Sequence, residues 1–111
     1  MNRTAVLNVV GLTPDLIGNH TPNLKRWFDQ GKMTPVRSML PAVTCSVQAT
    51  YLTGEMPDTH GIVANGWYFR EMDEIKFWRQ SNKLVQSKKI WERLKEDNPD
   101  FTCANLFWWY N

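Results

Sequence analysis

The chain has 111 residues, of which 42% are hydrophobic, 13% aromatic and 22% charged, and its formal net charge is +2. This length allows a single domain at most. The apolar and aromatic content excludes an intrinsically disordered chain. A charge this close to neutral does not predict binding to nucleic acid or to a membrane surface.

The sequence also limits where the protein resides. It contains no run of 18 apolar residues, which predicts that no segment spans a membrane. The short apolar stretch near the start is interrupted by Asn8 and has no cleavage site after it, so it does not fit a signal peptide. Cys45 and Cys103 cannot form a disulfide framework, and we expect both to be small buried residues. The default compartment is then the cytoplasm, where thiols stay reduced.

Three segments in the first part of the chain have recognisable patterns. The apolar run over residues 4–10 predicts a buried strand of the kind found in parallel sheets. Thr21 and Pro22 supply an N-cap hydroxyl and a proline at the first helical position, which predict a helix that ends at Gly31. Residues 32–39 fit a short extended segment that follows this helix.

The rest of the chain predicts two more helices and one more strand. A helix is expected over residues 44–53, with a glycine directly after it as its stop. Residues 67–78 mix polar and aromatic side chains and fit a hairpin or an irregular excursion. Ser87 predicts the cap of a helix over residues 88–97, and residues 101–108 predict another buried strand. This order indicates the α/β class, with a mostly parallel sheet flanked by helices.

The strongest candidate for chemistry lies where the helix over residues 44–53 begins. Free backbone N–H groups and the positive end of the helix dipole gather at such a point, which favours anions. The hydroxyl of Thr44 could contact a phosphate there, and a nearby metal ion would further stabilise its alkoxide. The alternative is an ordinary N-cap threonine. Cys45 is a rival nucleophile, because a helix N-terminus lowers the pKa of a thiol, but no histidine stands at a recognisable spacing from it.

A second candidate lies in residues 58–66. Asn65 either holds a turn or points its amide at a substrate oxyanion. His60 could be a ligand or a base, but a lone histidine before a glycine is more often a hydrogen-bonded structural residue. A metal site needs several converging ligands, and His20 and His60 cannot supply one alone.

The chain also has six tryptophans, most of them in its second half and interleaved with lysine and arginine. Such a combination can stack the bases of a single-stranded nucleic acid. The acidic residues Glu71, Asp73 and Glu74 lie among these lysines and arginines, and their negative charge would weaken the binding of a phosphate backbone. Core aromatics with a charged rim are the simpler interpretation, so nucleic-acid binding is the less favoured hypothesis.

Several short motifs together resemble one known family. They are Pro41-Ala-Val-Thr44, Gln48-Ala-Thr50, Leu52-Thr53-Gly54, Pro57, His60-Gly61-Ile62 and Asn65, with Val6 to Gly11 and Thr21-Pro22 before them. This set resembles the type I phosphodiesterase/nucleotide pyrophosphatase branch of the alkaline phosphatase superfamily. The stretch from Phe77 to Asn82 and the ending Phe107-Trp108-Trp109-Tyr110 resemble its bacterial members in particular, so the resemblance covers essentially the whole chain. The resemblance implies an alkaline-phosphatase-like α/β fold and a hydrolase that cleaves phosphodiester or pyrophosphate bonds.

The resemblance also implies roles for individual residues. Thr44 corresponds to the nucleophile that attacks phosphorus, forms a phospho-threonine intermediate and ligates one of two divalent metal ions, usually zinc. Asn65 corresponds to the asparagine whose amide binds a nonbridging phosphate oxygen, and the backbone N–H of Cys45 is expected to hold the same phosphate. The implied partner is a small phosphate ester or a nucleotide, and neither a nucleic acid nor a membrane is implied.

The chain departs from the family pattern in two respects. Where the family has an Asp-Gly pair whose aspartate binds a metal ion, this chain has Val10 and Gly11, and valine cannot bind a metal. The remaining ligands of the family lie far downstream, so we expect residues 1–111 to be the N-terminal portion of one longer catalytic domain, inactive in isolation. Val10 also supports an alternative, in which the chain binds a phosphate or nucleotide without cleaving it.

Overall fold

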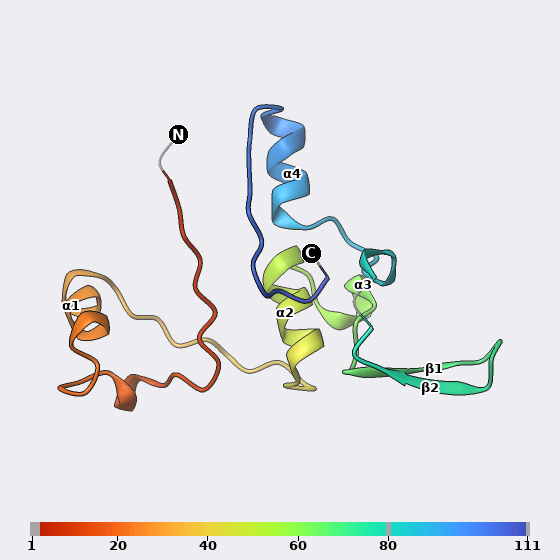
Figure 1. Ribbon diagram of the computed structural model, residues 1–111, viewed down its shortest axis with the longest axis horizontal. Coiled ribbons are helices and arrows are strands. Elements are labelled where there is room, and N and C mark those ends of the chain that lie inside the picture. Colours follow the sequence, from red (N-terminus) through yellow and green to blue (C-terminus); the bar gives the residue numbers. More distant parts are fainter. Residues whose placement is uncertain (1–2, 80, 111) are drawn as a thin grey trace. The chain divides into compact units, whose positions relative to one another are not determined.

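The structure is a computed structural model that describes residues 3–79 and 81–110. The chain divides into two compact units, residues 1–37 and residues 38–111. Figure 1 labels the helices and the hairpin in chain order. In the described ranges, none of the helices combines the length and the apolar character that crossing a bilayer requires.

The first unit contains a 3₁₀ turn, η1 (Pro14–Leu16), and one helix, α1 (Pro22–Gln30). Proline at the first position and glycine after the last confirm the predicted bounds of α1. Thr21 precedes the helix, but its side chain makes no capping bond to it. The Thr21 hydroxyl instead accepts a hydrogen bond from the backbone N–H of Gly18 at 2.9 Å. It therefore fastens the loop before α1.

The strand predicted over residues 4–10 does not form. These residues belong to neither a strand nor a helix, and the only sheet in the described part of the chain is a two-stranded one in the second unit. Their side chains are exposed, with Val6 at 73% and Val10 at 83%. A strand needs a hydrogen-bonded neighbour and a covered face. In this unit residues 4–10 have neither, and residues 32–39 likewise form no strand.

Helix α2 (Thr44–Thr53) is the most buried element of the second unit. It ends at Gly54, whose φ of 72° is the left-handed conformation that favours glycine after a helix. The predicted bounds of this helix are confirmed. The side chains that α2 buries are Cys45, Ser46, Gln48, Ala49, Leu52 and Thr53.

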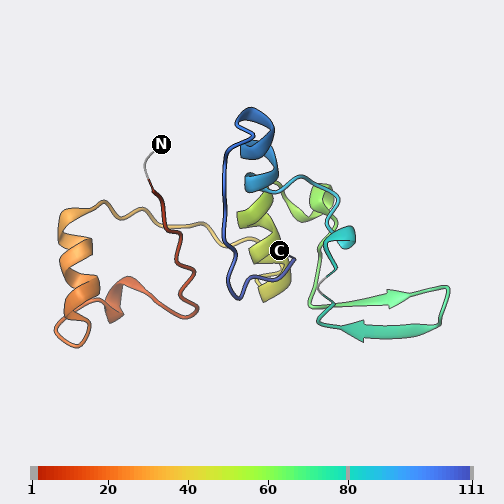
Figure 2. The ribbon, with the colours of Figure 1, turned by 45° about the horizontal axis from the view of Figure 1, so that its top comes forward.

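A short helix, α3 (Pro57–His60), follows α2 and leads into an antiparallel hairpin of β1 (Gly66–Phe69) and β2 (Glu74–Phe77). The hairpin confirms one of the two forms expected for residues 67–78. Gly66 lies opposite Phe77, and a Cβ at Gly66 would stand 2.7 Å from the ring of Phe77. Figure 2 shows the hairpin projecting away from the helices of its unit. No parallel sheet forms among residues 3–79 and 81–110, which corrects the predicted sheet type.

The second unit continues with a 3₁₀ turn, η2 (Asn82–Leu84), and helix α4 (Ile90–Asp97). Helix α4 begins two residues later than predicted, and its N-cap is Lys89 rather than Ser87. The reason is a local bond in which the backbone N–H of Lys89 donates to the carboxylate of Glu92 at 2.6 Å. A side chain that reaches back to the N-cap in this way starts a helix at that residue.

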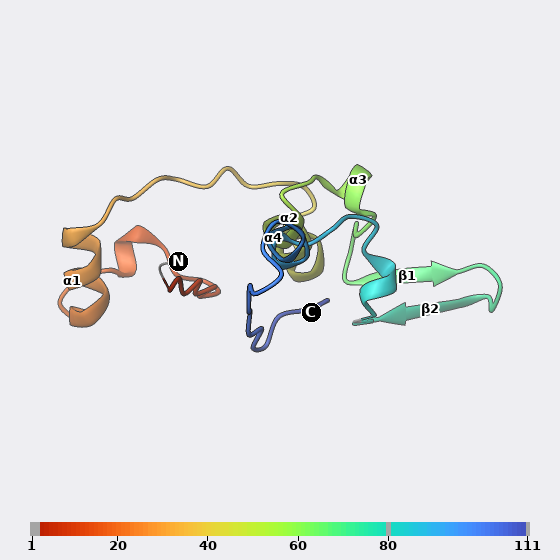
Figure 3. The ribbon, with the colours of Figure 1, turned by 90° about the horizontal axis from the view of Figure 1, so that it is seen from above.

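After α4 the chain returns past α2, as Figures 1 and 3 show. Residues 101–108 form no strand, against the prediction, because no other strand lies beside them in the described structure. Cys103 in this segment is exposed, also against the prediction, whereas Cys45 is buried as expected. The core of the unit consists of Cys45, Ala49, Ile62 and Tyr110, with Trp67, Leu84, Val85 and Trp109 packed against it.

Candidate functional site

Helix α2 begins without a capping side chain of its own. The N-cap position is Val43, which has no side-chain acceptor, and Thr44 is the first helical residue. Thr44 is therefore not an N-cap threonine. The first bond within the helix runs from the N–H of Val47 to the carbonyl of Val43 at 3.0 Å. The N–H groups of Thr44, Cys45 and Ser46 consequently have no acceptor inside the helix.

One of these three groups is satisfied from a distant part of the sequence. The backbone N–H of Cys45 donates to Oδ1 of Asn65 at 2.9 Å. Asn65 directly precedes β1 and is half-buried. The bond uses the oxygen end of the Asn65 amide, which leaves the NH₂ end as a donor for a ligand. From the family resemblance, the backbone N–H of Cys45 was expected to bind a phosphate. In the structure it donates to Asn65 instead, and this bond holds Asn65 at the first turn of α2.

The approach to the helix is fixed by Ser46. Its buried hydroxyl donates to the carbonyl oxygen of Pro41 at 2.9 Å and lies 3.2 Å from that of Val43. This ties the segment before α2 to the first turn of the helix. Thr44 is half-buried, and no hydrogen bond of its hydroxyl occurs among the contacts found in the described structure. The hydroxyl of Thr44 is therefore available to react, whereas the hydroxyl of Ser46 is hydrogen-bonded to backbone carbonyl oxygens.

The thiol of Cys45 is a poor rival nucleophile. Its side chain is fully buried, in the same cluster as Ile62 and Tyr110. Burial raises the pKa of the Cys45 thiol, with a smaller opposing effect from Tyr110. Burial likewise raises the pKa of Tyr110, so both groups stay neutral at ordinary pH. A thiol that is hidden and protonated does not attack, which leaves the hydroxyl of Thr44 as the nucleophile candidate.

His60, at the end of α3, is fully buried and bonded through both ring nitrogens. Nδ1 accepts from the backbone N–H of Ile62 at 3.0 Å, so Nδ1 carries no proton. The proton then lies on Nε2, which is 3.0 Å from Oγ1 of Thr50 on α2. Burial is the main cause that lowers the pKa of His60. His60 is therefore a neutral structural residue, as its position before Gly61 favoured.

Two pairs of aromatic rings lie in the second unit, and Asn65 has a backbone bond to one of their residues. The Trp67 and Tyr110 rings meet edge to face with centroids 6.4 Å apart, and those of Trp78 and Trp109 lie 5.2 Å apart. The backbone N–H of Trp78 also donates to the carbonyl oxygen of Asn65 at 2.8 Å. Trp67 and Trp109 pack against the core as half-buried side chains, whereas Trp78 is exposed, so the tryptophans only partly match the expected core aromatics.

Sequence reasoning missed the contact made by Gln48. This side chain is 7% exposed, and its Oε1 accepts from the backbone N–H of Trp109 at 2.9 Å. The bond attaches the segment after α4 to α2. The available signal was a polar residue on the buried face of a helix, because such a group must find a partner. The sequence does not say which residue supplies it.

The residues that the structure describes do not make a metal centre by themselves. The described ranges contain no group of three or more His, Cys, Asp or Glu side chains placed to hold an ion. Thr44 offers a single hydroxyl oxygen, and Val10, at the position of the family's aspartate, offers no ligand atom. A zinc or other divalent site requires several converging ligands.

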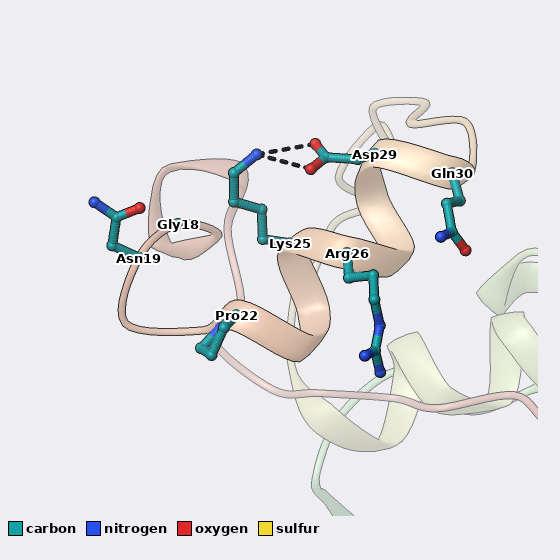
Figure 4. A pocket seen from close by; sticks show the side chains of 7 residues that line it. All are labelled: Gly18, Asn19, Pro22, Lys25, Arg26, Asp29 and Gln30. Atoms are coloured by element: carbon teal, nitrogen blue, oxygen red, sulfur yellow. Dashed lines mark hydrogen bonds and ion pairs between the residues drawn. The ribbon is translucent and has the colours of Figure 1, made fainter.

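A separate pocket lies wholly within the first unit (Figure 4). Its lining residues are Gly18, Asn19, Pro22, Lys25, Arg26, Asp29 and Gln30. The Nζ of Lys25 is paired with the carboxylate of Asp29 at 2.9 Å, one turn further along α1. The pocket is open, and its charged side chains lie on an exposed face of α1.

Comparison with known proteins identifies the family of the chain. The family model described as type I phosphodiesterase/nucleotide pyrophosphatase matches residues 4–111. Comparisons with curated proteins and with solved structures gave no significant match. The family is generally metal-dependent and acts on small phosphate-ester or nucleotide substrates. Because its model extends over nearly every residue, the chain belongs to the type I phosphodiesterase/nucleotide pyrophosphatase family.

Proposed function

We propose that this chain carries the nucleophile segment of a hydrolase that cleaves phosphodiester or pyrophosphate bonds through a phospho-threonine intermediate on Thr44. Asn65 would bind the phosphate in this reaction, and the first turn of α2 would supply its positive field. The substrate would be a small phosphate ester or a nucleotide. Residues 1–111 would form the N-terminal portion of the catalytic domain.

The observation that supports the proposal is the bond between the N–H of Cys45 and Oδ1 of Asn65. It brings a primary amide to the turn of α2 that begins with Thr44. A hydroxyl nucleophile and an amide donor at one helix N-terminus suit attack on a phosphate, because negative charge grows on the nonbridging oxygens as the nucleophile approaches. No other hydroxyl in this turn is available, since that of Ser46 donates to the backbone.

The chemistry has two steps. Oγ1 of Thr44 attacks phosphorus, and a bond forms between them while the bond from phosphorus to the leaving oxygen breaks. The hydroxyl proton is lost to solvent, and the leaving oxygen takes up a proton or departs as an anion. Water then attacks the phospho-threonine, which releases the phosphate product and restores the Thr44 hydroxyl. The NH₂ of Asn65 donates to the same nonbridging oxygen in both steps.

Metal dependence belongs to the proposal through the family alone. Two divalent ions, zinc by resemblance, would lower the charge on the phosphate when bound. Thr44 is the one ligand that this chain would contribute, and the described residues do not supply the others. We therefore derive no step through a metal ion.

The test uses the complete natural protein that contains these residues. Hydrolysis of bis(p-nitrophenyl) phosphate is measured with added zinc or manganese. We expect Thr44→Ala to reduce kcat by at least about 100-fold, because a nucleophile cannot be replaced by positioning alone. Thr59→Ala, at an exposed threonine of α3, is the matched control and should keep full activity. Acid quenching followed by mass spectrometry should find phosphate on the peptide that contains Thr44. Unchanged hydrolysis in Thr44→Ala would end the assignment.

A second candidate function is a family member that binds a phosphate or nucleotide without turnover. Val10 favours it, because the aspartate that binds metal in the family is missing. Metal analysis of the complete protein separates the two functions: two ions per chain support the hydrolase. Phosphate binding without bound metal and without hydrolysis supports the binding protein.

A further inference from the structure

We propose that Thr50 and His60 are positioning residues that hold the loop of residues 60–65 so that Asn65 presents its oxygen to Cys45 and its NH₂ to a phosphate. This inference rests on the proposed function, in which Asn65 is the phosphate donor. It assigns no chemical step to either residue.

The first attachment of the loop is at the C-terminal half of α2. Nε2 of His60 lies 3.0 Å from Oγ1 of Thr50, and the tautomer requires Nε2 to donate. The same ring receives the N–H of Ile62 on Nδ1. The imidazole of His60 thus joins α2 to the backbone of the loop. Because the ring is rigid and planar, the position of Thr50 on α2 determines the position of Ile62 in the loop.

The middle of the loop is fixed by packing and by the backbone. Ile62 is fully buried and packs in the cluster that contains Cys45 and Ala49 of α2. The carbonyl oxygen of His60 accepts from the N–H of Gln86 at 3.0 Å. Gly61 has a φ of 81°, and a Cβ there would lie 3.1 Å from the Gln86 side chain. The loop is therefore bounded by α2 on one side and by residue 86 on the other.

The second attachment is the bond from the Cys45 N–H to Asn65 at 2.9 Å. Cys45 and Thr50 are five residues apart on α2, which corresponds to about 7.5 Å along a helix axis. The loop runs beside this length and is fastened near both ends. A change at Thr50 that releases His60 should therefore move Asn65, although the two residues share no contact in the structure.

The position of the loop matters because it decides which end of the Asn65 amide faces Cys45 and which end faces a phosphate. Its two ends differ only in being an acceptor or a donor, and the Cys45 N–H selects the acceptor end. A shift of the loop that breaks this bond removes the hydrogen bond that fixes which end of the amide faces α2. A donor displaced by about 1 Å loses much of its effect on a reacting phosphate.

The experiment follows the Cys45 amide by NMR in the complete protein labelled with ¹⁵N-cysteine and ¹⁵N-valine. The signals of Cys45 and Val47 are those lost in Cys45→Ser and Val47→Ile, which assigns them. The Val47 amide, bonded within α2, reports whether the helix itself is intact. The variants are Thr50→Val, which removes the hydroxyl, and Thr50→Ser, which keeps it. Thr53→Val is the control, because it removes a hydroxyl of α2 that donates to Ala49 and does not contact the loop.

We expect hydrogen exchange at Cys45 to become at least 10-fold faster in Thr50→Val, with Val47 unchanged, and to return to the parent rate in Thr50→Ser. His60→Asn retains an acceptor for Ile62 but not the link to Thr50, and should behave like Thr50→Val. Equal Cys45 exchange in Thr50→Val and the parent protein overturns the proposal. A parallel rise at Cys45 and Val47, or the same rise in Thr53→Val, also overturns it, because the effect is then general loosening of α2.

This readout is independent of catalysis. If Thr44→Ala keeps full hydrolysis, the proposed function fails while the exchange rates still decide whether Thr50 and His60 position Asn65. If the hydrolase function and the positioning of Asn65 are both correct, Thr50→Val should lower kcat more than it changes KM, and Thr50→Ser should restore kcat.

Discussion

The backbone N–H of Cys45 and the side chain of Asn65, twenty positions apart in sequence, are joined by a hydrogen bond of 2.9 Å. The helix that begins at Thr44 has no local cap, since Val43 occupies that position. Asn65 therefore takes the place of an N-cap side chain from outside the helix. One contact thus stabilises α2 and holds the Asn65 amide at the helix turn that begins with Thr44.

The two roles of Asn65 can be separated by substitution. Asn65→Ala removes the acceptor for the Cys45 N–H and should lower the free energy of unfolding by about 1–3 kcal/mol. Asn65→Asp keeps an acceptor, and its negative charge suits a helix N-terminus, so stability should be retained. The carboxylate cannot donate and repels a phosphate, so binding of inorganic phosphate should weaken in both variants. Urea denaturation and ³¹P NMR titration measure the two effects. Parent-like phosphate binding in Asn65→Asp would exclude the amide as the donor.

His60 should make stability depend on pH. Burial lowers its pKa in the folded protein, against smaller opposing effects that include Asp58 and Glu55. The unfolded chain takes up the proton near pH 6.5, so below that pH it binds more protons than the folded chain. The contribution of His60 to the free energy of unfolding is therefore fully present above pH 6.5. It is lost as the pH falls through the pKa that His60 has in the folded protein.

Urea midpoints at pH 7.5 and pH 5.5 measure this effect. Acidic groups titrate in both the parent protein and His60→Gln, so the difference between their pH slopes isolates the histidine. The parent protein should lose more stability on acidification than the variant does. Identical slopes would mean that His60 has the same pKa in the folded and unfolded chains.

The two cysteines should react at very different rates with a thiol reagent. Cys103 is exposed and Cys45 is fully buried with a raised thiol pKa. Because the thiolate is the reacting species, Cys45 in a Cys103→Ser background should react at least about 100-fold more slowly than Cys103 in Cys45→Ala. Tyr110→Ala should accelerate Cys45, since it removes the side chain that covers it. Ellman's reagent under native conditions gives the rates, and comparable rates would contradict the buried position of Cys45.

Gln48 should stabilise the fold through the hydrogen bond that its Oε1 accepts from the backbone N–H of Trp109. Gln48→Leu fills similar space but leaves the N–H of Trp109 without its partner. We expect the free energy of unfolding to fall by about 1–3 kcal/mol. Gln30→Leu, at an exposed glutamine of α1, is the matched control and should change it by less than about 0.5 kcal/mol. Tryptophan fluorescence during urea denaturation measures both, and equal effects would show that the bond to Trp109 adds nothing.

Helix ends were the part of the fold most readable from the sequence. Pro22 and Gly54 restrict the backbone through their own geometry, so α1 begins and α2 ends where these residues predict. The start of α4 was placed wrongly, because Ser87 is a usual capping residue by type, whereas the helix begins where the carboxylate of Glu92 accepts from the backbone N–H of Lys89.

Strands were less predictable. Apolar runs at residues 4–10 and 101–108 indicate a preference for burial, but a strand exists only with a partner. The only paired strands described are β1 and β2, which are joined by a short turn. Cys103, which was expected to be a small buried residue, lies in the second of these runs and is exposed because that run has no covering neighbour.

The sequence by itself determined that α2 begins beside Thr44 and ends at Gly54, and its motifs indicated the family, because these depend on neighbouring residues. Only the tertiary structure decided that Asn65 meets Cys45 and that His60 meets Thr50. Those pairs are formed when the loop after α3 closes onto the helix, which depends on buried packing around Ile62 rather than on any residue's own preference.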